Sequence, residues 1–103
     1  MKTLEKEIRK NGFDYKLVER NETCAIYEQI NNDDGEKYTV AFEVFKIKIT
    51  KDATICGNQL IGGEVFPGNE DFGKTAFSFG TFGNRENALK KSYKKYEELS
   101  LNK

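Results

Sequence analysis

The stretch KYTVAFEVFKIKIT, residues 37–50, decides the fold class, because it is the longest part of the chain with an extended pattern. Its first apolar set occupies every second position: Tyr38, Val40, Phe42 and Val44. Its second set takes the opposite phase: Phe45, Ile47 and Ile49. Alternation of this kind is typical of a strand with a buried face. The change of phase after Val44 predicts either a bulge or a strand that passes from one packing surface to another.

Shorter segments on both sides of this stretch also alternate between apolar and polar residues. They predict strands at residues 13–17, 23–30 and 75–82, and a short strand at 60–66. The sequence NNDDG at residues 31–35 predicts a tight turn, because Asp-Gly favours positive φ. We therefore expect an antiparallel sheet of four or five strands.

The C-terminal segment predicts the most regular element, a helix from Arg85 to about Leu99. Asn84 directly precedes it and is a suitable N-cap. The residues of its apolar stripe recur at helical spacing: Ala88, Leu89, Ser92, Tyr93, Tyr96 and Leu99. Such a stripe predicts a helix with one face packed on the sheet.

The N-terminal segment predicts a second, shorter helix. Leu4 and Ile8 have helical i, i+4 spacing, and Asn11-Gly12 provides a stop signal after Thr3–Lys10. The predicted fold class is therefore α+β, as one domain over residues 1–103. The C-terminal helix is expected to pack across one face of the antiparallel sheet through Leu89, Tyr93 and Tyr96.

The composition indicates a small domain with a modest core. Of the 103 residues, 37% are hydrophobic and 33% are charged, and eight Phe and five Tyr supply much of the apolar bulk. The 17 basic and 17 acidic residues give a net charge of zero, which does not favour a general nucleic-acid binder. The chain shows no signal segment and no apolar run of membrane-spanning length. We therefore expect a cytoplasmic protein with no membrane partner.

The residues that most often carry catalysis are scarce. The chain has no histidine, which is the commonest general base and metal ligand. Its two cysteines, Cys24 and Cys56, lack metal-type spacing, and we expect both to be reduced thiols. The sequence therefore predicts that the protein is not an enzyme and has no catalytic residues, cofactor or metal site.

The segment GNEDFGKT, residues 68–75, matches the phosphate-binding formula G-x-x-x-x-G-K-[ST]. In a true phosphate-binding loop a helix follows directly, and its N-terminus faces the anion. Here the next residues, AFSFG, alternate as a strand does, and Glu70 and Asp71 would place negative charge against the phosphates. We interpret the segment as an acidic turn that enters a strand. A nucleotide site at Lys74 is the less favoured alternative.

The segment 51–74 is long and irregular, and its part from Gly57 to Lys74 is the first candidate for a binding surface. It contains five glycines and the only proline, and long irregular segments often carry binding sites. Aromatic side chains on such a loop are typical interface anchors. We therefore predict a non-catalytic protein-binding module, such as an inhibitor or adaptor. Its candidate contact residues are Phe66, Pro67, Asn69, Glu70, Asp71 and Phe72.

A group of lysines supports an alternative function, nucleic-acid binding. Some lie on adjoining faces of the predicted C-terminal helix and others alternate along the long strand: Lys90, Lys91, Lys94, Lys95, Lys46 and Lys48. Such a row can follow a phosphate backbone. Charged runs on helices are also commonly solvated faces. The identity of the partner and the oligomeric state stay open.

The central part of the chain resembles small uncharacterised proteins of bacteriophages and prophages. The resemblance extends over residues 40–79 and includes FEVF at 42–45 and EVFPGNEDFGK at 64–74. It implies a compact accessory role, such as host modulation or counter-defence, and it carries no functional residues.

Two shorter resemblances concern nucleic-acid-binding families. The segment GTFGNRENA, residues 80–88, resembles the strand-to-helix junction of AP2-type DNA-binding domains, although their basic and tryptophan-rich strand residues are absent. The predicted α-β-β-β-α order is similar to that of double-stranded-RNA-binding domains. Their last helix begins K-K-x-A-K, whereas this one begins RENAL at residues 85–89.

Overall fold

The computed structural model describes residues 3–10, 12–32, 37–50, 53–55, 57–60, 62–68, 71–81 and 84–101. Its main sheet is antiparallel, with the strand order β1-β2-β3-β4-β9. The strand bounds are β1 Glu7–Lys10, β2 Phe13–Arg20, β3 Cys24–Asn31, β4 Tyr38–Lys46 and β9 Ala76–Gly80. The other elements are β5 Lys48–Ile49, β6 Ala53–Ile55, β7 Asn58–Leu60, β8 Glu64–Val65 and the helix α1 Arg85–Leu101.

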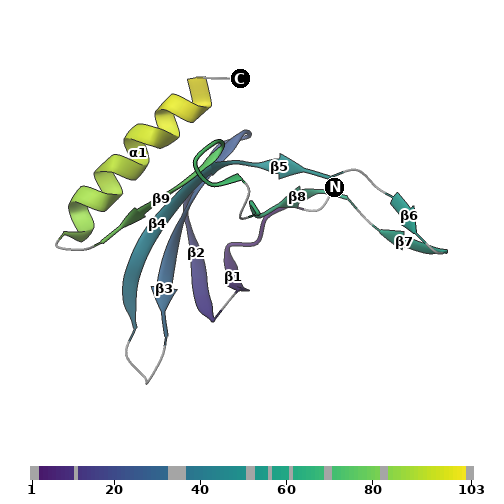
Figure 1. Cartoon of the computed structure of the whole chain (residues 1–103), viewed down its shortest axis with the longest axis horizontal. Helices are drawn as coiled ribbons and strands as arrows, with labels where there is room; N and C mark the ends of the chain where they lie inside the picture. The colour runs from purple at the N-terminus through teal and green to yellow at the C-terminus, as the bar shows by residue number, and fades with distance from the viewer. Residues whose placement is uncertain are drawn as a thin grey trace.

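Helix α1 and two short ladders lie on opposite sides of the main sheet (Figure 1). The helix packs chiefly against β4 and also contacts β3 and β9. The ladders pair β5 with β8 and β6 with β7, and the β6–β7 ladder extends away from the sheet (Figure 1). The predicted α+β class, with an antiparallel sheet and a C-terminal helix packed on one face, is confirmed.

Strand β4 is buried on both faces, from Ala41 to Phe45. Its pairing with β3 and β9 shows no register shift at Val44 and Phe45. The core beneath α1 contains Cys24, Ile26, Phe42, Val44, Ala88 and Leu99. The core on the opposite face contains Tyr15, Ala25, Tyr27, Phe45 and Ala76. The phase change therefore marks a passage between two packing surfaces, and the alternative of a bulge at this position is wrong.

The prediction of an N-terminal helix over Thr3–Lys10 is wrong. The segment contains strand β1, and its Ile8 packs against the core opposite α1. Lys10 pairs with Phe13, so the predicted helix stop is instead a hairpin connection. Gly12 has a φ of 81°, a left-handed conformation that glycine adopts without strain. A helix of so few residues would be marginal, whereas β1 gains a ladder with β2 and a share of the core.

Helix α1 begins and packs as predicted. The Asn84 side-chain oxygen accepts a hydrogen bond from the Asn87 N–H at 3.2 Å, which caps the helix. The Ser92 hydroxyl donates to the Ala88 carbonyl at 2.8 Å, so this buried group has a partner within the helix. The residues of the stripe that are buried or pack on the sheet are Ala88, Leu89, Ser92, Tyr93, Tyr96 and Leu99.

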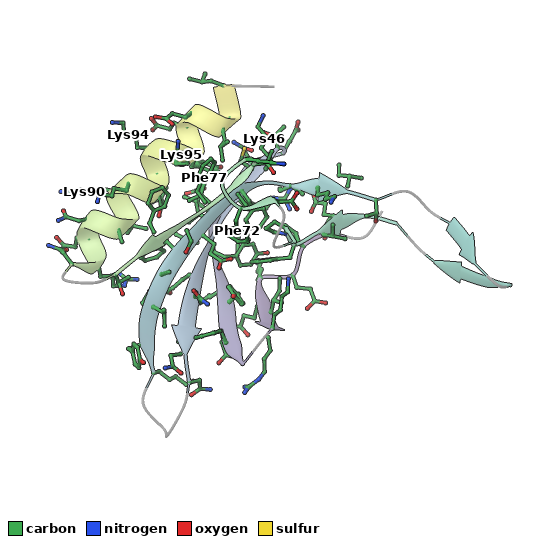
Figure 2. All side chains as sticks on the ribbon, in the orientation of Figure 1. Lys46, Phe72, Phe77, Lys90, Lys94 and Lys95 are labelled. Carbon is green, nitrogen blue, oxygen red and sulfur yellow. The ribbon has the colours of Figure 1, made fainter. Side chains whose placement is uncertain are left out.

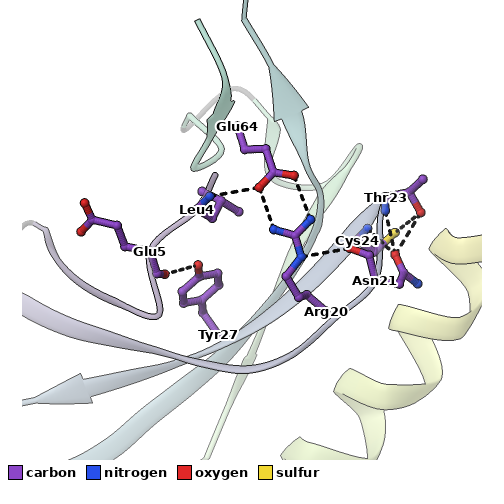
Figure 3. Close-up of polar contacts among 8 residues, drawn as sticks. All are labelled: Leu4, Glu5, Arg20, Asn21, Thr23, Cys24, Tyr27 and Glu64. Carbon is purple, nitrogen blue, oxygen red and sulfur yellow. Dashed lines mark hydrogen bonds and ion pairs between the residues drawn. The ribbon is translucent and has the colours of Figure 1, made fainter. Parts of the chain in front are cut away.

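Phe66 closes the core on the face opposite α1. Its ring centroid lies 4.9 Å from that of Phe45, 5.1 Å from Tyr15 and 5.3 Å from Tyr27. Tyr27 also donates a hydrogen bond from its hydroxyl to the Glu5 carbonyl at 2.6 Å (Figure 3). These contacts fasten both the N-terminal segment and the segment after β8 to the sheet.

An ion pair joins β2 to β8 on the same face. Arg20 donates to both carboxylate oxygens of Glu64, at 2.6 and 2.8 Å, and the Leu4 N–H donates to Glu64 Oε1 at 3.0 Å (Figure 3). The Glu64 side chain is only 8% exposed. The hydrogen bonds from Arg20 hold the pKa of Glu64 below its usual range.

The other predicted strands are present, with bounds that differ from the predicted ones by a few residues. The strands predicted at 13–17, 23–30 and 75–82 correspond to β2, β3 and β9, and the short strand predicted at 60–66 is represented by β8. The turn predicted at 31–35 lies largely outside the described residues, as does Cys56.

Cys24 is a buried free thiol. None of the described residues form a helix with the length and apolar character that crossing a membrane requires.

We expect Glu64→Gln to lower the free energy of unfolding by about 1–2 kcal/mol, because it weakens a charge-assisted contact to Arg20 in a buried setting. Chemical denaturation at neutral pH measures this change. Glu98→Gln is the matched control, because Glu98 pairs with Lys95 and its own side chain is exposed, and it should leave the unfolding midpoint nearly unchanged. Equal effects of the two substitutions would show that the Arg20–Glu64 pair does not secure the fold.

Candidate protein-binding groove

The main sheet ends in two edges of different character. Strand β1 has the sequence EIRK, and charged side chains discourage pairing with a further strand. Strand β9 has the sequence AFSFG, with neither charge nor proline, and its Ser78 and Gly80 are exposed. An uncharged, exposed edge is a template for an added strand.

Hydrogen bonds at both ends of β9 show which way its backbone groups point. The Thr75 carbonyl accepts a hydrogen bond from Lys46 of β4 at 2.8 Å, and the Thr81 N–H donates one to β4 at 3.0 Å. In an antiparallel ladder, alternate residues of an edge strand direct both backbone groups to the neighbouring strand. The N–H and C=O groups of Ser78 and Gly80 therefore point away from β4 and are available to a ligand.

A groove lies between this edge and the N-terminal half of α1. It has a volume of about 260 Å³ and is lined by Ser78, Phe79, Gly80, Asn84, Asn87, Ala88 and Lys91. The same side of α1 continues to Lys95, whose Nζ lies 4.6 Å from the centroid of the Phe77 ring. β9 and α1 run side by side in Figure 1. The groove therefore lies along β9, beside the helix that runs next to this strand.

The helix side of the groove is positively charged. Lys91 is exposed, and within the described residues it takes part in no ion pair. Lys95 forms an ion pair with Glu98 at 2.9 Å. None of the described residues that line the groove has a carboxylate. Arg85, at the start of α1, is neutralised by Glu28 at 3.0 Å.

The structure separates the helix lysines that were predicted to bind nucleic acid. Lys90 and Lys94 lie on the outer side of α1, whereas Lys95 lies toward the sheet, near Phe77 (Figure 2). Lys91 lines the groove. The predicted row is therefore divided between an outer surface and the wall of the groove.

The two sheet lysines of the same prediction belong to another hollow. Lys46 and Lys48 line it together with Asp71 and Thr75. The Lys48 Nζ lies 3.9 Å from the Asp71 carboxylate, which offsets its charge. Their contribution to a nucleic-acid surface stays a prediction.

The loop residues that were predicted to contact a protein partner include several with contacts inside the fold. Phe66 lies within the aromatic cluster, Pro67 is buried, and Phe72 packs against the core opposite α1. Asn69 and Glu70 lie outside the described residues. A partner contact through this loop stays a prediction.

The segment that matches the phosphate-binding formula enters strand β9 and not a helix. The Asp71 carboxylate accepts a hydrogen bond from the Gly68 N–H at 2.9 Å, and the Gly73 N–H donates to the Ala76 carbonyl at 2.7 Å. The amides of Asp71, Lys74 and Thr75 also donate to carbonyls of this turn, so five backbone amides of the formula are bonded within the chain. The arrangement agrees with an acidic turn that enters a strand, and it leaves Lys74 exposed beside the turn.

A buried carboxyl group lies on β4, on the face opposite α1. Glu43 is 7% exposed and lies between Tyr27 of β3 and Ser78 of β9. Among the described residues its Oε2 has no hydrogen-bond partner. Burial raises the pKa of Glu43 to about 7, although the charge of Lys10 acts in the opposite direction. Burial also raises the pKa of Tyr15 to about 12, and the nearby Glu43 adds to that shift.

A larger hollow of about 540 Å³ lies along β1. Charged side chains of both signs line it, and Arg9 and Asp14 form an ion pair at 3.6 Å. Its three basic and two acidic side chains offset one another in part. The groove beside β9 differs from it, because Lys91 is the one charged residue among the described residues that line the groove.

No family of known proteins, no curated protein and no solved structure matches this chain. The functional assignment therefore depends on the geometry of the groove itself.

We expect Glu43→Gln to stabilise the protein at alkaline pH. Glu43 has a pKa of about 7 when folded, against an ordinary value of 4.5, so the wild-type protein loses stability as pH rises from about 4.5 to 7. The variant avoids this loss, so its advantage should be small at pH 4 and reach about 3 kcal/mol at pH 8. Denaturation of both proteins across this pH range measures the difference. A difference that does not vary with pH would show that Glu43 is ionised in the folded state.

Proposed function

We propose that this protein is a non-catalytic protein-binding module that takes up an extended segment of a partner by strand addition to β9. The observation that carries the proposal is the outward-facing backbone of Ser78 and Gly80, on an uncharged edge beside the groove with α1. Strand addition to a sheet edge is a recurrent mode of peptide recognition.

Two kinds of contact would hold the added strand. Its main chain would bond to the free backbone groups of Ser78 and Gly80, and each such hydrogen bond contributes about 1 kcal/mol net. Its side chains would alternate, with one set toward α1 and Lys91 and the other beside the Ser78 side chain. The main-chain contacts would supply affinity, and the side chains would supply selectivity.

A role as an inhibitor or adaptor fits this mode of binding, because an extended segment of another protein is the natural ligand of a sheet edge. The accessory role implied by the resemblance to phage proteins agrees with it. The cytoplasm remains the location in which we expect this role.

The outer side of α1 supports nucleic-acid binding as a second candidate function. Lys90 and Lys94 are exposed there, and neither takes part in an ion pair within the described part of the chain. They could follow a phosphate backbone. This function ranks second, because the outward N–H and C=O groups of β9 are suited to pair with the main chain of a peptide. A nucleic acid has no such main chain.

Ser78→Pro tests the proposed function directly. The substitution removes an outward N–H and leaves the ladder to β4 intact, since proline is tolerated on an edge strand when its nitrogen faces solvent. Short peptides would be selected from a random library on the wild-type protein and then titrated against Ser78→Pro and the control Ser78→Ala. We expect affinity to fall by about tenfold or more with proline, because hydrogen bonds are lost and the ring obstructs the edge. Alanine should bind like the wild type.

Peptides that bind the proline and alanine variants equally would contradict strand addition. Circular dichroism and thermal unfolding would establish that the proline variant is folded. If it is not, amide chemical shifts of the wild-type protein provide the test. The largest peptide-induced changes must then fall on Ser78 and Gly80, and changes confined to other surfaces would overturn the proposal.

A further inference from the structure

The positions of two lysines along the groove carry an inference about the partner. Lys91 lines the groove next to Ser78 and Gly80, and Lys95 lies one helical turn further on, over the Phe77 ring. They are four residues apart on one side of α1, which corresponds to a rise of about 6 Å along the helix axis. Two residues of an extended strand rise about 6.6 Å. Alternate side chains of a strand docked on β9 would therefore match the spacing of these lysines.

The directions of the side chains in a docked strand determine which of its residues can contact Lys91 and Lys95. A residue directly opposite Ser78 would share the face of the Ser78 side chain, away from α1, because side chains of paired residues lie on the same face of a sheet. Its two neighbours in the docked strand would face α1. These neighbours are the residues within reach of Lys91 and Lys95.

The charge of the groove determines the chemistry of those two positions. Among the described residues, no carboxylate lines the groove and Lys91 has no ion-pair partner. Lys95 already pairs with Glu98 at 2.9 Å, so a docked carboxylate would share this lysine with Glu98. We infer that the partner of this groove is an extended acidic peptide with carboxylates at alternate positions, an acid-x-acid pattern that pairs with Lys91 and Lys95. This inference rests on the proposed strand addition and names its ligand class.

Fluorescence anisotropy with labelled peptides at low salt tests the inference. The probe is the capped peptide Thr-Thr-Glu-Val-Glu-Thr-Thr, and the comparison peptides replace both Glu by Gln or place the two Glu side by side. We expect the alternating acidic peptide to bind about tenfold more tightly than the Gln peptide, and its affinity to fall as salt rises. The peptide with adjacent acids should bind more weakly than the alternating one, because one carboxylate would then face away from α1.

Substitutions on α1 distinguish the wall of the groove from the rest of the helix. Lys91→Gln and Lys95→Gln should each lower the affinity for the alternating peptide by about threefold to fivefold. The matched controls Lys90→Gln and Lys94→Gln should leave this affinity within about twofold of the wild-type value. Glu98→Gln should strengthen binding by about twofold, because it frees Lys95. Equal losses for inner and outer lysines would overturn the inference.

The proline variant separates failure of this inference from failure of the proposed function. If acidic and Gln peptides bind equally and Ser78→Pro abolishes both, strand addition stands and the acidic pattern is wrong. If no peptide binds the wild-type protein at millimolar concentration, both proposals fail. A single-stranded oligonucleotide could instead bind more tightly than the acidic peptide, with an affinity that Lys90→Gln and Lys94→Gln lower. In that case α1 binds nucleic acid and the inference is wrong.

Discussion

The burial of β4 on both faces is the constraint on which the rest of the structure depends. Phe42 and Val44 require a cover on one side, and α1 supplies it; Phe45 requires one on the other, where Phe66 packs against it. A strand buried on both faces needs apolar residues in both phases, and residues 37–50 provide them. Glu43 is the exception within this strand, and its burial costs free energy because its Oε2 has no hydrogen-bond partner among the described residues.

The position of the groove follows from the same arrangement. Because α1 is anchored over β4 and reaches β9, it leaves the outward backbone of β9 uncovered and forms a wall beside it. The opposite edge, β1, carries the charges that usually protect a sheet from further pairing, whereas β9 carries none. The asymmetry between the two edges is the structural basis for assigning binding to β9.

The sequence predicted the features that depend on local periodicity. The stripe from Ala88 to Leu99 predicted α1. The two apolar phases of residues 37–50 predicted either a bulge or a strand that passes between two packing surfaces, and the second is what β4 does. Asn11-Gly12 was ambiguous, because the same pair ends helices and connects hairpin strands. The groove could not be predicted, since it depends on the pairing of β9 with β4 across a long sequence separation. Glu43 stood at an alternating polar position that normally faces solvent, so its burial also required the fold.

Hydrogen exchange of the β9 amides in the free protein tests the central claim most directly, because it measures whether this edge is open. The account predicts that the Ser78 and Gly80 amides exchange rapidly, while those of Phe77 and Phe79 are protected by their hydrogen bonds to β4. Alternating protection along five residues of one strand would establish an available edge. Uniform protection of all these amides would contradict it, because the outward groups would then already have partners.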